Sequence, residues 1–385
     1  LSSYYVGRVL REVMNFSRRM QEGQLDRRGD AAAGKVLRVG YQGAEGSFSH
    51  LSLTKLFATR RVDSYRPVGY RSFTEAVDAL EAGEVDYTLL PIENTIAGSL
   101  NETYQLLAER TLAIVDEEIL PVDHCLAALP GTRIDDLRTV RSHAVALQQC
   151  RAFLAGLPGC RTEARSDTAR AAESVASSGE ATLGAICSEE AAGRLGLTIL
   201  ARDVADRPHN RTRFVLVGLE AEEMDTRLPA RTSLILTVNH RRGALARCLD
   251  SLAARDVNLT KLESRARPDS PWEYLFYLDI EGHGADPRVK EALDEILGYT
   301  NTLKVLGSYP RRTEAETDEA PAEPVSLETT PAPANPVRPS RAVVARSHLR
   351  HCGLRENGEP SVVKIGQARV GNGHFMFIAG PCAVE

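Results

Sequence analysis

Between residues 36 and 219 the hydrophobic positions alternate between short strand-like runs and longer stretches with helical spacing. The strand-like runs are rich in Val, Leu and Tyr, and helix-like segments separate them. The first part of this pattern predicts strands over 36–41, 64–68 and 87–92, with helices from residue 48 and over 73–81. Strands that alternate with helices in this way are typical of a doubly wound α/β fold.

The predicted strand over 87–92 ends in polar residues. Glu93 and Asn94 follow it directly, and the small residues Ala97 and Gly98 come next. Ligands of open α/β sheets bind at the carboxyl ends of the strands, so these two polar side chains are candidates for a site. The alternative is that they only close a turn. Ser99, with Glu102 three residues later, predicts a capping box at the start of the following helix.

A second α/β unit follows the first and implies a cleft. A helix is expected around 145–154, and Asp167 or Thr168 is expected to cap the next one. Two such units joined by crossing strands leave a cleft between them, which is a natural site for a small molecule. The strands of this part are expected over 112–119, 123–129, 139–142, 183–187, 198–203 and 212–219.

The glycines near the first strand do not form a dinucleotide-binding motif. Gly40, Gly43 and Gly46 are spaced three residues apart, whereas the dinucleotide fingerprint is GxGxxG. Ser47 is instead expected to cap the helix beside the same strand ends.

Residues 231–310 change character. Their order is strand, helix, strand, strand, helix, strand, which is the split βαβ arrangement. After Pro310, the stretch 313–339 is rich in Pro, Ala and Glu and poor in large apolar residues, which predicts a linker. The predicted elements of the split βαβ unit are strands over 232–238, 258–264, 272–280 and 303–309 and helices over 245–254 and 289–297.

Composition and charge narrow the function classes. The 385 residues are 43% hydrophobic and 26% charged, with a net charge of -5, which argues against a nucleic-acid surface. There is no run of eighteen apolar residues and no signal peptide, so we expect no membrane partner and a cytoplasmic location. The seven cysteines lack CxxC spacing, which argues against a zinc site, and no metal or cofactor is expected.

The segment Asn210-Arg-Thr-Arg-Phe214 is a second candidate motif. Strand alternation puts Thr212 and Phe214 on one face and Arg211 and Arg213 on the other. A short hydroxyl between two cations, beside an asparagine, is unusual at a strand start. The alternative is an arginine pair on a surface edge with a threonine that favours the strand.

These two motifs, with Gly43-Ala-Glu-Gly-Ser-Phe-Ser49, Ser142-His143 and Asp167-Thr-Ala169, resemble prephenate dehydratase over residues 36–220. The resemblance implies a two-lobed α/β catalytic domain similar to periplasmic binding proteins. It also implies decarboxylating dehydration of prephenate to phenylpyruvate in phenylalanine biosynthesis. In that resemblance Thr212, Glu93 and Asn94 are catalytic, with Thr212 the donor to the leaving hydroxyl, while the expected substrate-binding residues are Ser142, Gln149, Thr168, Arg213 and Ser47.

Residues 230–311 resemble the regulatory ACT domain that is fused to this enzyme, a ferredoxin-like βαββαβ fold. The resemblance implies a homodimer or higher homo-oligomer that binds L-phenylalanine as a feedback effector. Ala266 replaces the proline usual after the Glu-Ser-Arg triplet, which leaves the effector response open, and a purely structural dimerisation domain is the alternative. The expected effector residues are Gly243, Ala244, Leu245, Asn258, Leu259, Glu263, Ser264 and Arg265.

The two ends of the chain resemble other enzymes of aromatic biosynthesis. Residues 1–22 resemble the last helix of a chorismate mutase, and 23–35 is expected to be a linker. Residues 312–345 are a second expected linker, and 346–385 resemble the first barrel strand of 3-deoxy-D-arabino-heptulosonate 7-phosphate synthase. The chain is therefore expected to be an internal piece of a longer multifunctional polypeptide.

Two other functions remain open from the sequence. Arogenate dehydratase performs the same elimination on an amino substrate, and the residues do not separate the two. A two-lobed protein that senses a small anion without turning it over would also fit a cleft between α/β units.

Overall fold

The computed structural model describes residues 36–60, 62, 64–226, 228–267, 270–312, 363–365 and 368–370. Two units, Leu1–Glu323 and Pro324–Glu385, divide the chain. Of the second unit, only a short antiparallel hairpin is described, in which β16 (Val363–Ile365) pairs with β17 (Ala368–Val370). The chorismate mutase-like helix, the first expected linker, the second expected linker after residue 312 and most of the synthase-like segment lie outside the described residues.

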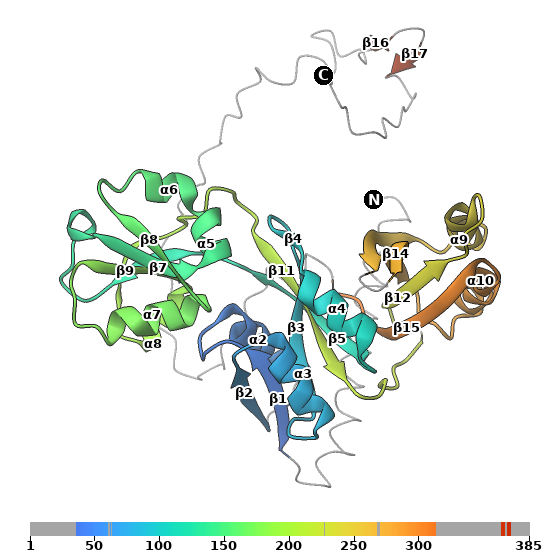
Figure 1. Cartoon of the computed structure of the whole chain (residues 1–385), viewed down its shortest axis with the longest axis horizontal. Helices are drawn as coiled ribbons and strands as arrows, with labels where there is room; N and C mark the ends of the chain where they lie inside the picture. Colours follow the sequence, from blue (N-terminus) through green and yellow to red (C-terminus); the bar gives the residue numbers. More distant parts are fainter. Residues whose placement is uncertain are drawn as a thin grey trace, which may run out of the picture. The chain divides into compact units, whose positions relative to one another are not determined.

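The first sheet of the large unit has the strand order β2-β1-β3-β11-β5, and β4 pairs with β3 at one end. β1, β2 and β3 are parallel, whereas β11 is antiparallel to both β3 and β5. Helices α2, α3 and α4 belong to this lobe (Figure 1). The strands are β1 (Leu37–Gln42), β2 (Tyr65–Tyr70), β3 (Tyr87–Asn94), β4 (Gly98–Ser99), β5 (Ala113–Pro121) and β11 (Arg211–Gly218), and the helices are α2 (Phe48–Arg60), α3 (Phe73–Glu81) and α4 (Asn101–Glu109).

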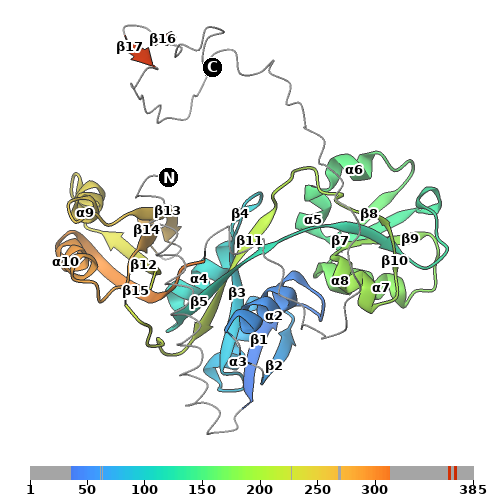
Figure 2. The ribbon, with the colours of Figure 1, turned by 180° about the vertical axis from the view of Figure 1, so that it is seen from behind.

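The second sheet has the order β10-β6-β9-β7-β8, and the chain enters it from β5 and leaves it into β11 (Figure 2). The two connecting segments touch, because the amide of Val122 donates to the carbonyl of Asn210 at 2.8 Å. This lobe comprises the strands β6 (Cys125–Ala128), β7 (Thr139–His143), β8 (Arg161–Arg165), β9 (Leu183–Cys187) and β10 (Thr198–Ala201), the helices α5 (Ala144–Gln149), α6 (Arg151–Ala155), α7 (Thr168–Ala176) and α8 (Glu189–Arg194), and the 3-10 turn η1 (Ile134–Asp136).

The third sheet has the order β13-β14-β12-β15, which is the ferredoxin-like arrangement expected from the sequence. Helices α9 and α10 lie together on one face, where Leu252 and Ile296 pack against Leu234 and Leu278 of the strands (Figure 1). The elements are β12 (Ala230–Val238), α9 (Ala244–Ala253), β13 (Leu259–Arg267), β14 (Ser270–Glu281), α10 (Pro287–Ile296), η2 (Leu297–Tyr299) and β15 (Thr300–Pro310).

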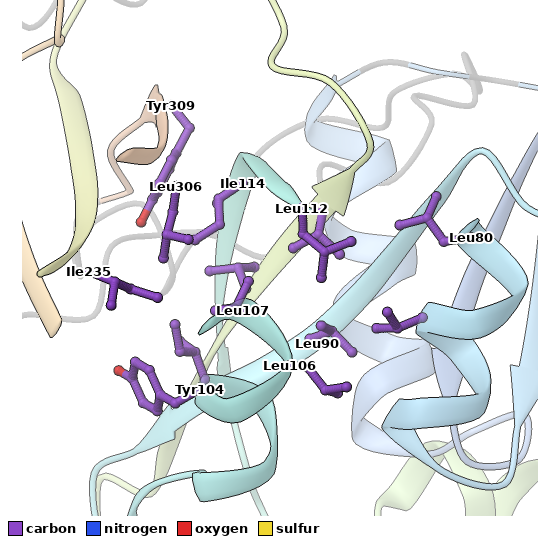
Figure 3. Packing of buried hydrophobic residues seen from close by; sticks show 14 of the residues in the cluster. Leu80, Leu90, Tyr104, Leu106, Leu107, Leu112, Ile114, Ile235, Leu306 and Tyr309 are labelled. Carbon is purple, nitrogen blue, oxygen red and sulfur yellow. The ribbon is translucent and has the colours of Figure 1, made fainter. Parts of the chain in front are cut away.

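The other face of this third sheet is covered by the first lobe. Tyr104 and Leu107 of α4 lie in one buried cluster with Ile235 and Tyr309 of the third sheet (Figure 3). β15 comes so close to β5 that a Cβ on Gly307 would meet the carbonyl oxygen of Ile114 at 2.1 Å. Continuous apolar burial therefore joins the two sheets into one folded unit.

The alternating strand and helix order is confirmed, and two local predictions are wrong. The helix expected over 145–154 is interrupted at Cys150, which ends α5 and precedes α6. The capping box at Ser99 does not form, because Ser99 pairs as a strand residue with Glu93 and α4 starts two residues later. Leu100 is the residue before α4, and no side chain caps that helix.

No helix in the described ranges is long and apolar enough to cross a membrane.

Candidate active site

A cleft of about 410 Å³ collects the starts of several helices from both lobes. Residues at or just before the first turns of α2, α3, α4 and α7 line it, and so do polar side chains from β3 and β11. Because the first amides of a helix lack partners within the helix, such a lining favours anions. The lining includes Ser47, Arg71, Ser72, Leu100, Asn94, His124, Gln149, Asp167, Thr168 and Thr212.

Asn94 and Thr212 meet in this cleft because they are register partners on β3 and β11. The Oδ1 atom of Asn94 accepts from the amides of Ile96 at 3.0 Å and Ala97 at 2.7 Å. This fixes the orientation of the side-chain amide, so its Nδ2 donates to the Oγ1 of Thr212 at 2.9 Å. The hydroxyl of Thr212 is therefore an acceptor from Asn94, and among the described residues none accepts its own proton.

Two further residues extend this network: Asn210, which stands in the second motif without an assigned role, and His124, which no motif contains. Asn210 accepts from Asn94 Nδ2 at 2.7 Å and donates through its own Nδ2 to Gln149 Oε1 at 3.1 Å. His124, which is 2% exposed, places its Nε2 at 2.9 Å from the same Oε1 atom. Asn210 and His124 lie in the two segments that connect the lobes, so nothing in the local pattern of either segment marks them as neighbours.

Three of the predicted substrate-binding residues line the cleft. Ser47 precedes α2 and its hydroxyl accepts from the amide of His50 at 3.4 Å, as expected for a cap. Thr168 is the first residue of α7, whose cap is Asp167, with Oδ1 accepting from the amide of Arg170 at 2.8 Å. Gln149 also lines the cleft and is the last residue of α5.

Ser142 is not part of the cleft lining. It is fully buried, and its hydroxyl donates to the carbonyl of Ile186 at 2.7 Å. Within β7 it pairs with Ala164 of β8, an edge strand of the second sheet. Its hydrogen bond joins the end of β7 to β9 beside the start of α5.

Glu93 and Arg213 face away from the cleft, so the expectation that Glu93 is catalytic together with Asn94 and Thr212 is contradicted by this geometry. The two are register partners, one residue along from the pair Asn94 and Thr212, and successive side chains of a strand point to opposite faces. Arg213 Nε lies 2.7 Å from Glu93 Oε1, and Glu93 also forms an ion pair with Lys261 of β13.

Arg213 is a buried connector between sheets rather than an anion clamp. Its guanidinium also contacts Glu117 of β5 at 3.2 Å and Asp279 of β14 at 2.6 Å, and its side chain is 5% exposed. Burial opposes its charge, but these carboxylates, led by Asp279, hold the pKa of Arg213 above its ordinary value. Burial raises the pKa of Glu93, and the cations Arg213 and Lys261 outweigh it, so the net pKa of Glu93 lies below its usual range.

Arg71 is a cation of the cleft lining that the sequence reasoning missed. It immediately precedes Ser72, the cap of α3, whose hydroxyl accepts from the amide of Glu75 at 3.1 Å. An arginine beside a helix cap at a strand end was the only signal in the sequence for this role. It supplies a positive charge on the rim opposite the lobe that carries α7.

The predicted effector residues lie in the third sheet and its first helix, and none of them lines the described cleft. Strand alternation on β13 sends Glu263 and Arg265 toward the first lobe, while Ser264 is exposed on the other face. Gly243 caps α9 with a left-handed φ of 75°. The remaining predicted positions are Ala244 and Leu245 in α9 and Asn258 and Leu259 at the start of β13.

A short segment over residues 97–102 connects β13 with the cleft. Ala97 and Leu100 line the cleft. Ser99, which lies between them, donates to Glu263, and Asn101, which follows Leu100, accepts from Arg265. The same segment thus has one side in the cleft and the other on β13.

Comparisons with known proteins agree on one family. The family model described as prephenate dehydratase matches residues 39–222. The bifunctional chorismate mutase/prephenate dehydratase of Enterobacter agglomerans is 35% identical over 324 residues, covering 84% of this chain and 82% of that protein. The chloroplastic arogenate dehydratase/prephenate dehydratase 1 of Arabidopsis thaliana is 36% identical over 288 residues, covering 71% of this chain and 72% of that protein.

Solved structures give the same fold. The structure of prephenate dehydratase from Arthrobacter aurescens in complex with L-Phe has a TM-score of 0.65 and 28% identity, and covers 74% of this chain and 92% of that chain. A protein described as a novel type of quorum quenching acylase, GqqA, has a TM-score of 0.63 and 33% identity, and the match covers 71% of this chain and 98% of that chain.

Proposed function

The chain belongs to the prephenate dehydratase family, and on that basis we propose that its cleft converts prephenate to phenylpyruvate. In this reaction the ring C–O bond breaks, and the leaving hydroxyl becomes water by taking up a proton from solvent. The bond between the ring and its carboxylate breaks as well, its electron pair enters the ring, and the carboxylate leaves as CO2. The site must therefore supply a hydrogen-bond donor at the leaving hydroxyl and hold two carboxylates.

The single observation that carries the proposal is the orientation of Thr212. Because Asn94 donates to its Oγ1, the Thr212 proton is left to point at a ligand in the cleft. A threonine hydroxyl is too weak an acid to give up its proton outright, so its contribution is a hydrogen bond that strengthens as the leaving oxygen gains charge. Such a donor is worth roughly a hundredfold to ten-thousandfold in rate.

The two carboxylates of the substrate match the cleft lining. The starts of α2, α3 and α7 come from different lobes, so amide dipoles act on the cleft from two sides. Arg71 adds a full positive charge beside α3. Ser47 and Thr168 are the substrate-binding residues that this arrangement supports, and Gln149 acts through the polar network.

Phenylalanine is proposed as the effector, acting through the segment over 97–102. The complex of the Arthrobacter aurescens prephenate dehydratase with L-Phe supports an L-Phe site in this chain. A ligand that engages Glu263 or Arg265 would compete with Ser99 and Asn101 for the same groups, and the cleft side of that segment would respond. A coupling of about 1–3 kcal/mol between the two sites is expected. The proposal also includes a homo-oligomeric state and the domain limits expected from the sequence, which are 36–220 for the catalytic domain and 230–311 for the ACT domain.

Formation of phenylpyruvate from prephenate tests the proposed reaction. We expect Thr212→Val to lower kcat by about a hundredfold to ten-thousandfold with little change in KM, whereas Thr212→Ser retains the hydroxyl and most of the rate. Full activity of Thr212→Val would overturn the mechanism. A wild-type chain that binds prephenate without forming product would favour the anion sensor.

Arogenate dehydration is the second candidate, because the Arabidopsis thaliana relative carries both names and an exposed carboxylate, Glu102, lines the cleft. An ammonium group on the substrate would be stabilised by such a carboxylate. The ratio of kcat/KM for arogenate and prephenate decides between the two. If arogenate is the better substrate, Glu102→Gln should lower that ratio; an unchanged ratio would remove Glu102 from the recognition.

Effector binding is tested by activity assays with added L-phenylalanine and by calorimetry. We expect activity to fall and binding heat to be measurable. Unchanged activity without binding would show that the third sheet is a structural domain only.

A further inference from the structure

His124 lies at the end of the hydrogen-bond network that begins at Thr212, yet neither of the two sequence motifs contains it. It is in the segment that connects β5 to β6, and it is 2% exposed. Phe48, the first residue of α2, packs edge-on against its ring with 5.5 Å between the centroids. The imidazole is thus held by a residue of the first lobe on one side and by Gln149 of the second lobe on the other.

Hydrogen-bond geometry determines which ring nitrogen of His124 carries the proton. The amides of Ile96 and Ala97 make Asn94 Oδ1 the acceptor side of that residue. Gln149 approaches this oxygen at 3.3 Å and must present its Nε2 there, which turns its Oε1 toward His124. Because an amide oxygen only accepts, the 2.9 Å contact requires a proton on Nε2 of His124.

The other ring nitrogen supports the same assignment. Nδ1 of His124 is buried and has no hydrogen-bond partner among the described residues. A proton there would be an unsatisfied buried donor, whereas a bare lone pair costs less. Burial also lowers the pKa of His124, which agrees with a neutral ring.

We propose that His124 is a positioning residue for the dehydration: its Nε2–H holds Gln149 Oε1, so that Gln149 and Asn210 keep the Asn94 amide aimed at Thr212. This inference rests on the proposed function of Thr212. The donor on His124 has no contact with Thr212 itself, and its effect is transmitted through the amide side chains of Gln149, Asn210 and Asn94. Without it, Gln149 Oε1 keeps only the donor of Asn210, and a Gln149 amide that turns over presents Oε1 to Asn94 Oδ1, which separates the two residues.

Three substitutions at His124 separate this role from simple packing. The amide of His124→Gln places an NH2 group near the position of Nε2, whereas the shorter side chain of His124→Asn places it near Nδ1; His124→Leu has no donor. We expect His124→Asn and His124→Leu to lower kcat about 10- to 100-fold with KM changed little, and His124→Gln to recover most of the loss.

The kinetic pattern has a clear contrary outcome. Equal losses in all three variants would mean that the ring acts by its shape, and full activity of His124→Leu would mean that Gln149 needs no support. Either result overturns the proposal. Circular dichroism and urea unfolding of each variant identify any that fail to fold.

Nitrogen NMR of the histidine rings gives a readout that is independent of turnover. The signal that disappears in His124→Gln belongs to His124, and we expect it to report a neutral ring protonated on Nε2. Gln149→Leu removes the acceptor and should shift this signal. A ring protonated on Nδ1, or no response to Gln149→Leu, would overturn the proposal even if every kinetic variant misfolds. A wild-type chain that shows the expected signal but does not dehydrate prephenate would instead refute the proposed function.

Discussion

The two faces of the β3–β11 strand pair use polar residues in opposite ways. On the cleft face, Asn94 and Thr212 are neutral and each hydrogen bond fixes the direction of the next. On the other face, one residue along each strand, Glu93 and Arg213 are charged and join the first lobe to β13 and β14. The neutral face has to point hydrogen-bond donors at a ligand. The charged face has to pair charges that are buried between two sheets.

Adjacent residues on each strand therefore have different roles: one takes part in the proposed catalysis, and the next joins the first lobe to the third sheet. A buried charge is tolerated only with partners in place, so Arg213 ties the folded first lobe to the folded third sheet. A neutral amide network loses its function when a donor is exchanged for an acceptor, because two acceptors then face each other. Substitutions on the two faces should therefore affect different measured quantities.

The largest effect is expected for Arg213→Met on stability. It leaves Glu93, Glu117 and Asp279 without the guanidinium that lies among them, and we expect the free energy of unfolding to fall by about 3–5 kcal/mol. Urea denaturation measures this. Arg202→Met is the matched control, because its ion pair with Glu189 is exposed and should contribute about 1 kcal/mol or less. Similar losses of unfolding free energy in Arg213→Met and Arg202→Met would show that the buried ion pairs stabilise the fold no more than an exposed pair does.

The next largest effect is expected for Asn94→Asp on the chemical step. The carboxylate can still accept from Ile96 and Ala97, but it cannot donate to Thr212 or Asn210. We expect kcat to fall about 100-fold, with a smaller change in unfolding free energy than for Arg213→Met. Steady-state kinetics and urea unfolding of the same preparation compare the two quantities. Equal activity of Asn94→Asp and wild type would remove Asn94 from the site.

Gly307→Ala tests whether the sheets are joined by close packing as well as by charge. The added Cβ would collide with the carbonyl oxygen of Ile114, and the φ of 154° is unfavourable for a residue with a side chain. We expect a loss of about 1–3 kcal/mol in unfolding free energy. Gly298→Ala is the control, because nothing lies within 4 Å of its Cβ position. Equal losses of unfolding free energy in Gly307→Ala and Gly298→Ala would contradict a tight contact between β15 and β5.

The smallest effect is expected in the pH dependence of stability that Glu93 contributes. Its pKa in the folded protein is held below the usual value of 4.5, so it stabilises the fold above that value and loses this contribution as pH falls through its lowered pKa. The stability difference between wild type and Glu93→Gln should therefore shrink between pH 6 and pH 3. Urea unfolding at both values measures it, and a difference that grows toward low pH would reverse the sign.

Local patterns in the sequence were enough to predict most helices and strands, their order along the chain, and the two motifs of the site. Strand runs and helical spacing are local properties, so the ferredoxin-like order after residue 230 could be predicted from spacing alone. The same holds for the caps at Ser47 and Asp167, because a cap depends on the residues within one helical turn.

Long-range packing, in contrast, set which face of each strand meets the cleft. Alternation showed that Thr212 and Arg213 must point to opposite sides, but it could not tell which side faces the cleft and which the third sheet. Packing of β13 and β14 against the first lobe turned Glu93 and Arg213 into connectors, and it used Ser99 for a contact instead of a cap. His124 and Asn210 became neighbours only because the two connecting segments run side by side, a pairing of residues far apart in the chain that no local pattern contains.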